Sequence, residues 1–188
     1  MILHSGARSR RLGLPPMGSG DRLAKALGRS LDDSWHWFRS IAPAGVETID
    51  AVVVGPGGTW TLTLAGDRGR FARRNGHWYR WNRSTESWVP WDATPITAAR
   101  LAGRRLSLVL ERAGLPASVD PILLPPSQME VEVAPRDPIG LTVEHDPDRI
   151  AGLVSAEERL SPPQVDRIVA LLDPRQPLPR LVQATRGG

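Results

Sequence analysis

The chain has 188 residues, of which 24 are Lys or Arg and 20 are Asp or Glu, so its formal net charge is +4. This length suits one hydrophobic core with short tails. The absence of cysteine excludes disulfides, thiolate catalysis and cysteine-ligated metal sites. Lys25 is the only lysine, and a GC-rich genome explains the arginine bias as well as selection for phosphate contacts does. The weak basicity permits contact with nucleic acid without requiring it.

The two ends of the chain differ in composition from its middle. Positions 1–18 combine Ser, Gly, Arg and Pro without periodicity, which predicts a disordered N-terminal tail. Positions 174–188 are rich in Pro and Arg and predict a second loose tail. The sequence has neither an apolar run of membrane-spanning length nor the apolar segment of a secretory signal. We therefore expect one domain over 19–173, a cytoplasmic location and no membrane contact.

The first predicted elements lead to the most informative segment of the chain. Helical periodicity predicts a helix over Asp21–Ser30, and the aromatic residues of Trp35–Phe38 predict a strand at the edge of a sheet. Ile49–Ala65 then indicates two strands joined by a tight Gly-Pro-Gly-Gly turn, whose glycines supply the positive φ angles of a reversal. Three consecutive valines in the first strand are typical of a strand covered on both faces.

Asp50 is the exception in that first strand. A carboxylate that enters an apolar strand costs free energy unless it is paired or holds a metal. Strand geometry alone favours an Asp that caps a turn or faces solvent. Only a second feature would favour a functional carboxylate.

Tryptophans and arginines alternate in the next part of the chain. Gly69–Arg74 and Gly76–Trp81 alternate polar and apolar residues, and Asn75-Gly76 between them predicts a hairpin. Aromatic residues interleaved with arginines can stack bases and contact phosphates, but cross-strand packing is the more common meaning. The residues concerned are Trp78, Trp81, Trp88 and Trp91 with Arg73, Arg74, Arg80 and Arg83.

The second half of the chain predicts one long helix and several shorter elements. The helix is expected from about Pro95 to Gly114. Arg104 and Arg105 lie off its apolar stripe, where they either contact phosphates or form a solvent-exposed face. That stripe consists of Ile96, Ala99, Ala102, Leu106, Val109, Leu110 and Ala113. The later elements are strands over Val119–Leu124 and Met129–Val133 and short helices over Asp146–Val154 and Pro162–Leu172.

The order of these pieces resembles the nuclease-related domain, or NERD, a distant branch of the PD-(D/E)XK nuclease-like fold. The resemblance spans roughly residues 18 to 173, and its most specific element is the run IDAVVVGPGG at positions 49–58. It implies an α/β fold, with a small mixed β-sheet flanked by helices and a Trp-rich hairpin. By this resemblance Asp50 and Asp21 are the residual catalytic and metal-binding acids, and their carboxylates are expected to approach each other across the interface between helix and strand. The nucleic-acid-binding candidates are Arg73, Arg74, Arg80, Arg104 and Arg105.

Departures from the family pattern bear directly on mechanism. A member with intact chemistry carries Glu-x-Lys on the second strand, and these positions are Thr63, Leu64 and Ala65 in this chain. The Glu would share a divalent metal with the Asp, and the Lys would polarise the attacking water and stabilise phosphate charge. We therefore expect no cofactor, or weak Mg²⁺ at most.

Three functions follow from this reading. The first is a catalytically degenerate nuclease-like domain, a pseudoenzyme that binds DNA, RNA or another protein. The second is an active metal-dependent nuclease whose missing acid has migrated to Asp67 or Glu47. Asp67 lies in a predicted turn, and Glu47 is an odd number of residues from Asp50, which on a strand would place the two on opposite faces. The third is a bacterial protein-interaction or structural domain with no nucleic-acid role.

Overall fold

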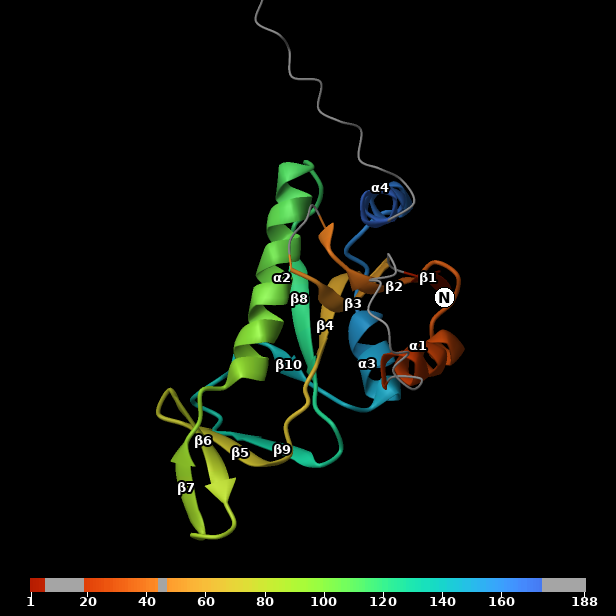
Figure 1. Cartoon of the computed structure of the whole chain (residues 1–188). Coiled ribbons are helices and arrows are strands. Elements are labelled where there is room, and N and C mark those ends of the chain that lie inside the picture. Colours follow the sequence, from red (N-terminus) through yellow and green to blue (C-terminus); the bar gives the residue numbers. More distant parts are fainter. Residues whose placement is uncertain (6–18, 44–46, 174–188) are drawn as a thin grey trace, which may run out of the picture.

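The computed structural model describes residues 1–5, 19–43 and 47–173. These residues form two mixed β-sheets flanked by four helices, which confirms the predicted α/β class (Figure 1). The helices are α1 (Ser19–Ser30), α2 (Thr94–Arg112), α3 (Pro147–Val154) and α4 (Pro162–Leu172). None of them is long and apolar enough to cross a membrane.

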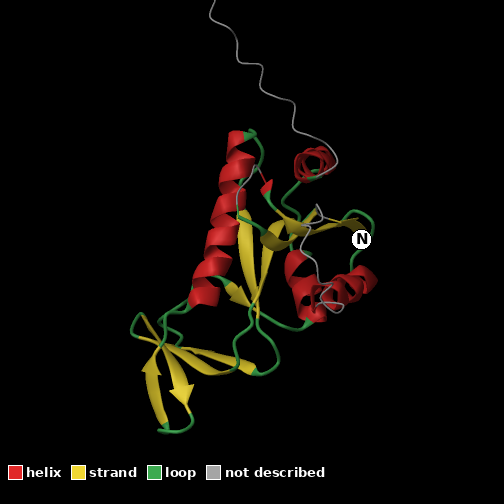
Figure 2. Cartoon of the chain, viewed as in Figure 1, coloured by secondary structure: helices red, strands yellow, loops and turns green. Residues whose placement is uncertain are grey.

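The larger sheet has six strands and carries the core. Their order is β1 (Ile2–Ser5), β2 (His36–Ile41), β3 (Ile49–Gly55), β4 (Gly58–Leu64), β8 (Val119–Leu124) and β10 (Thr142–Val143). Strand β3 is antiparallel to both β2 and β4, whereas β8 joins β4 in parallel through the long crossover that contains α2. Figure 2 shows α2 along one side of this sheet, with α1 and α3 on the other.

Both faces of β3 are buried, as the run of valines predicts. Ala51 and Val53 pack in one cluster with Leu27 of α1 and Ile150 of α3. The alternate residues Val52 and Val54 pack in a second cluster with residues of α2 and α4. A strand alternates its side chains between two faces, so consecutive apolar residues are needed where both faces are covered.

The turn between β3 and β4 is buried, and its glycines serve two purposes. Of Gly55, Gly57 and Gly58, only Gly58 has a positive φ, at 127°. A Cβ on Gly55 would overlap the ring of Trp35, and a Cβ on Gly57 would overlap the carbonyl oxygen of Val154. The prediction that the glycines supply positive φ therefore holds for one of them, while the other two permit close approach of neighbouring groups.

The smaller sheet contains the predicted hairpin and stands apart from the larger one (Figure 2). Its strands, in order, are β7 (Ser87–Pro90), β6 (His77–Asn82), β5 (Gly69–Arg74) and β9 (Met129–Val133). Asn75 and Gly76 at the β5–β6 turn have φ angles of 52° and 79°, as a tight hairpin turn requires. Trp78 and Trp91 pack against the cluster around Ile96 at the start of α2, which attaches the small sheet to the core.

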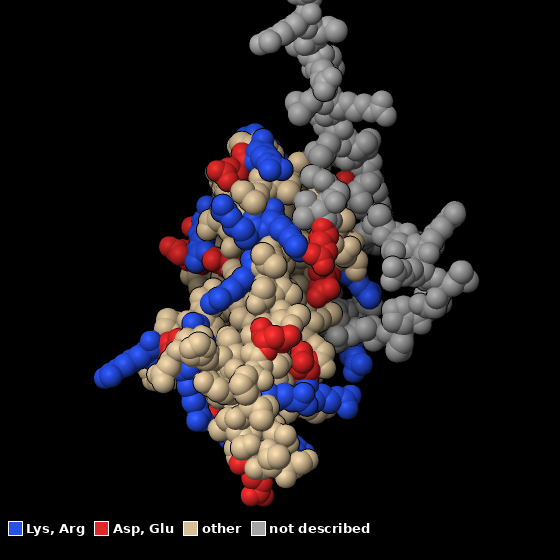
Figure 3. Space-filling view, turned by 60° about the vertical axis from the view of Figure 1, so that its left-hand side comes forward, with Lys and Arg blue, Asp and Glu red and all other residues tan. Residues whose placement is uncertain are grey.

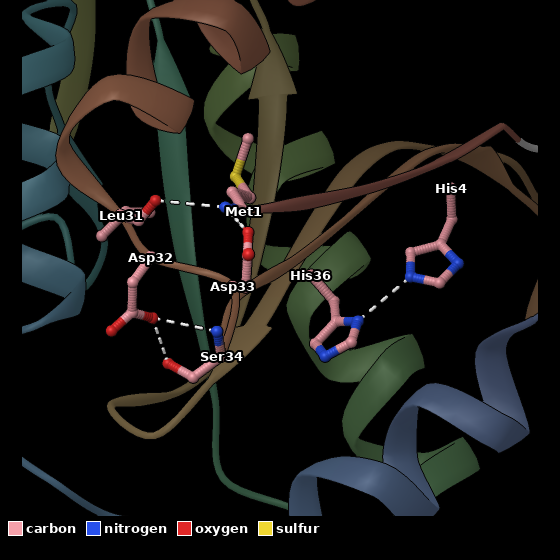
Figure 4. A network of polar contacts seen from close by, with 7 residues as sticks. All are labelled: Met1, His4, Leu31, Asp32, Asp33, Ser34 and His36. Carbon is pink, nitrogen blue, oxygen red and sulfur yellow. Dashed lines mark hydrogen bonds and ion pairs between the residues drawn. The ribbon is translucent and has the colours of Figure 1, made fainter.

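The N-terminal strand corrects two predictions. Ile2–Ser5 was expected to belong to a disordered tail, but it forms β1 and pairs in parallel with β2. Strand β2, expected at the sheet edge, therefore lies between β1 and β3. Figure 4 shows the contacts that fix β1, including His4 Nε2 at 3.1 Å from His36 Nδ1 and the Met1 amino group donating to the Leu31 carbonyl oxygen. The remaining residues of the two predicted tails, 6–18 and 174–188, lie outside the described residues.

Candidate functional site

Asp50 stands near the start of β3, with its side chain exposed to solvent. The register of the hairpin pairs Ala51 with Leu62, which places Asp50 beside Thr63 on the same face of the sheet. Asp50 Oδ2 accepts a hydrogen bond of 2.9 Å from the backbone N–H of Leu64. The strand therefore offers the carboxylate a backbone donor as well as water, and the desolvation cost expected of a buried acid does not arise.

Asp50 and Thr63 line a groove of about 500 Å³ between the large sheet and α2. The helix contributes residues spaced three or four apart, so that one stripe of α2 faces the groove. Its lining residues are Glu47, Thr48, Ile49, Asp50, Thr63, Leu64, Asp92, Thr94, Thr97, Ala98, Leu101, Ala102 and Arg105.

The other acids of the groove already have partners. Glu47 Oε2 lies 2.5 Å from Arg105 Nη1 in an ion pair, and Asp92 Oδ1 accepts from the backbone N–H of Thr94 at 3.2 Å. Glu47 shares the groove with Asp50, although counting residues along a strand predicts opposite faces. The count does not apply, because β3 begins only at Ile49.

The geometry does not assemble a metal site within the described residues, where no group of three or more Asp, Glu or His side chains converges. Asp67, the other candidate for a migrated acid, lies between β4 and β5 and is not part of the groove lining. Each carboxylate that lines the groove already has a partner, because Asp50 and Asp92 each accept from a backbone N–H and Glu47 pairs with a guanidinium. A divalent cation at Asp50 would draw most of its ligands from water.

Asp21 lies in the first turns of α1, and its side chain is outside the described residues. The described part of the helix packs through Leu23 and Leu27 on the face that holds Ala51 and Leu62. Asp50 lines the groove beside α2 on the other face. The approach of the Asp21 and Asp50 carboxylates stays a prediction.

Ala65, at the expected lysine position, follows the end of β4. Its backbone N–H donates to the Leu124 carbonyl oxygen at 3.0 Å. Its side chain packs against the apolar cluster of Ile96, Ala99 and Leu123. Thr63 and Ala65 are thus both turned toward α2, as two residues separated by one position on a strand should be.

The five arginines predicted to bind nucleic acid occupy different environments. Arg73 is committed to structure, because its Nε lies 3.1 Å from Asp137 Oδ1 and its Nη1 donates to the Pro138 carbonyl oxygen. Arg105 is paired with Glu47, and the guanidinium of Arg74 lies 4.8 Å from the ring centre of Trp88. Arg80 lines a pocket of the small sheet, and Arg104 is exposed on α2.

The basic residues do not form one continuous stripe. Figure 3 shows them in several groups on the face that bears α2, with acidic side chains between the groups. Sequence reasoning missed the pairing of Arg105 with Glu47, which lie 58 residues apart. The sequence feature that places Arg105 in the groove is the spacing of Thr94, Leu101 and Arg105, which puts these residues along one side of the helix.

No protein-family model, curated protein or solved structure matches the chain. What the groove can do is therefore judged from its own geometry and from the motifs that form it.

Proposed function

We propose that the protein is a NERD-like nuclease-related domain that has lost catalysis and binds nucleic acid. The observation that carries this proposal is the pairing of Asp50 with Thr63 across the β3–β4 hairpin. At this position the resemblance expects a second carboxylate. A threonine hydroxyl can at best hydrogen-bond a metal-bound water, so it cannot share a divalent metal with Asp50.

The lost groups are those that phosphodiester hydrolysis requires. Hydrolysis needs an activated water and stabilisation of the charge that grows on the phosphate. Arg105 is the basic residue of the groove, but it is paired with Glu47 and stays protonated. Each missing group should reduce the rate by about a hundredfold or more. The proposal includes at most weak Mg²⁺ binding at Asp50.

Binding without cleavage needs only positive charge and donors at the surface. Arg104 on α2 and Arg80 on the small sheet are exposed and have no carboxylate partner among the described residues. Such contacts release counterions from a nucleic acid, so affinity should fall steeply as salt concentration rises. We also propose that the protein acts in the cytoplasm.

A nicking assay on supercoiled plasmid with Mg²⁺ or Mn²⁺ tests the loss of catalysis. We expect wild-type protein, Asp50→Ala and the control Glu158→Ala, at an exposed acid outside the groove, to give the same background rate. Nicking by wild type and Glu158→Ala that disappears in Asp50→Ala would show an active nuclease. The same assay on the double variant Thr63→Glu/Ala65→Lys then tests whether the hairpin still supports metal-dependent cleavage.

A further inference from the structure

The small sheet carries a pocket that is separate from the Asp50 groove. It has a volume of about 640 Å³ and lies where β5 begins and β6 ends. Its lining residues are Arg68, Gly69, Arg80, Trp81, Asn82, Arg83, Ser84, Val89 and Gln128. Three of these are arginines and none is acidic, so the pocket concentrates positive charge.

The three pocket arginines differ from Arg70 and Arg73 on the same sheet. Arg70 is paired with Glu132 at 2.7 Å, and Arg73 with Asp137 at 3.1 Å. Arg68, Arg80 and Arg83 have no ion pair within the part of the chain that the structure describes. Guanidinium groups gathered in one concave site repel one another, and a bound anion would convert that repulsion into attraction.

Neutral donors complete the lining. Asn82 Oδ1 accepts from the backbone N–H of Ser84 at 2.9 Å, which leaves the amide NH₂ group of Asn82 for a ligand. The Ser84 hydroxyl and the Gln128 amide add further donors, and Val89 supplies an apolar wall. Planar guanidinium groups bind phosphate through paired hydrogen bonds, and the pocket has room for more than a single phosphate group.

We propose that this pocket binds a phosphate group of a nucleic-acid strand, with the adjoining nucleotide in the remaining volume. The inference rests on the proposed nucleic-acid function and assigns its main contact to Arg68, Arg80 and Arg83. The same chemistry would accept a free nucleotide, so the source of the phosphate is decided by experiment.

The test compares wild-type protein with Arg80→Gln/Arg83→Gln, using Arg29→Gln/Arg167→Gln on α1 and α4 as a control that removes the same charge. Both control arginines are exposed and lie outside the pocket. Fluorescence anisotropy measures the affinity for a labelled single-stranded oligonucleotide over a range of salt concentrations. Tryptophan fluorescence, which Trp81 in the pocket wall should report, measures binding of a mononucleotide.

We expect the pocket variant to lose about tenfold in affinity per arginine and to show a shallower salt dependence, while the control changes little. Arg80→Lys/Arg83→Lys should recover part of the affinity, and thermal unfolding checks that every variant is folded. Equal losses of affinity in the pocket and control variants would overturn the proposed phosphate site, because nonspecific electrostatic attraction would then explain binding. Wild-type affinity in the pocket variant would overturn it too, but would leave the proposed nucleic-acid function in place.

The mononucleotide separates the two proposals. If no oligonucleotide binds but a mononucleotide binds and is lost in the pocket variant, the phosphate site stands and the nucleic-acid function fails. If neither probe binds wild-type protein, both are wrong.

Discussion

Gly57 shows how a single residue fixes the geometry of the candidate site. It lies in the buried turn that sets the β3–β4 register, and that register brings Asp50 beside Thr63. The turn is also held from outside, because the backbone N–H groups of Arg159 and Leu160 donate to the Pro56 carbonyl oxygen at 2.8 and 2.9 Å. A side chain at position 57 would separate the turn from Val154, against which it packs.

We predict that Gly57→Ala destabilises the protein by about 3 kcal/mol, because the added methyl group meets backbone that cannot turn away. Gly66→Ala is the matched control, since nothing lies within 4 Å of a Cβ at that position. Denaturant unfolding followed by circular dichroism gives both free energies. A Gly57→Ala value as small as that of the control would mean that the turn is loosely packed.

Thr61 offers a prediction of the opposite sign. Its side chain is fully buried beneath α2, and its hydroxyl has no hydrogen-bond partner within the described residues. Thr61→Val keeps the shape and removes the unpaired hydroxyl, so it should raise the free energy of unfolding by about 1 kcal/mol. The exposed Thr97→Val is the control and should change stability little. A destabilised Thr61→Val would indicate that the hydroxyl is satisfied in solution.

At the scale of elements, periodicity predicted the strands and helices whose positions depend on local sequence. Strands β8 and β9 and helix α4 begin and end at the predicted residues, whereas α3 begins at Pro147, one residue later than predicted, because Asp146 is its N-cap. Strands β1 and β10 were missed, because two to four residues carry no readable period and both depend on distant partners. The predicted stripe of α2 included Ala113, which is exposed because the helix ends at Arg112.

The β1–β2 pairing carries a pH dependence. Burial, followed by the nearby His4, lowers the pKa of His36, while Asp166 of α4 opposes this shift. The folded protein therefore disfavours the protonated imidazole, and the unfolded chain takes up the proton first as pH falls below about 6.5. This contribution to stability is present above that pH and is lost as pH falls toward the lowered pKa.

We predict that the free energy of unfolding of wild-type protein falls more between about pH 6.5 and 5 than that of His36→Asn. His77→Asn, at an exposed position on the small sheet, is the control and should follow wild type. Urea titrations at each pH supply the comparison. Identical slopes for wild type and His36→Asn would remove His36 from the acid response.

At the scale of the whole molecule, the hairpin and the rest of the site differ in how far the sequence predicts them. The short turn fixes which residue stands beside Asp50, so the Asp50–Thr63 pairing follows from local sequence. The Glu47–Arg105 pair and the gathering of Arg68 with Arg80 and Arg83 depend on tertiary contacts that no periodic pattern records. The structure adds to the sequence by showing which arginines are already committed to carboxylates.

The central claim is that the molecule holds nucleic acid without cutting it, and one sample tests both parts. A labelled single-stranded oligonucleotide is mixed with protein and Mg²⁺, followed by anisotropy, and then run on a denaturing gel. We predict a salt-sensitive rise in anisotropy and an oligonucleotide that remains intact on the gel. An oligonucleotide that is cut by wild type but left intact by Asp50→Asn, or one that never binds, would contradict this account.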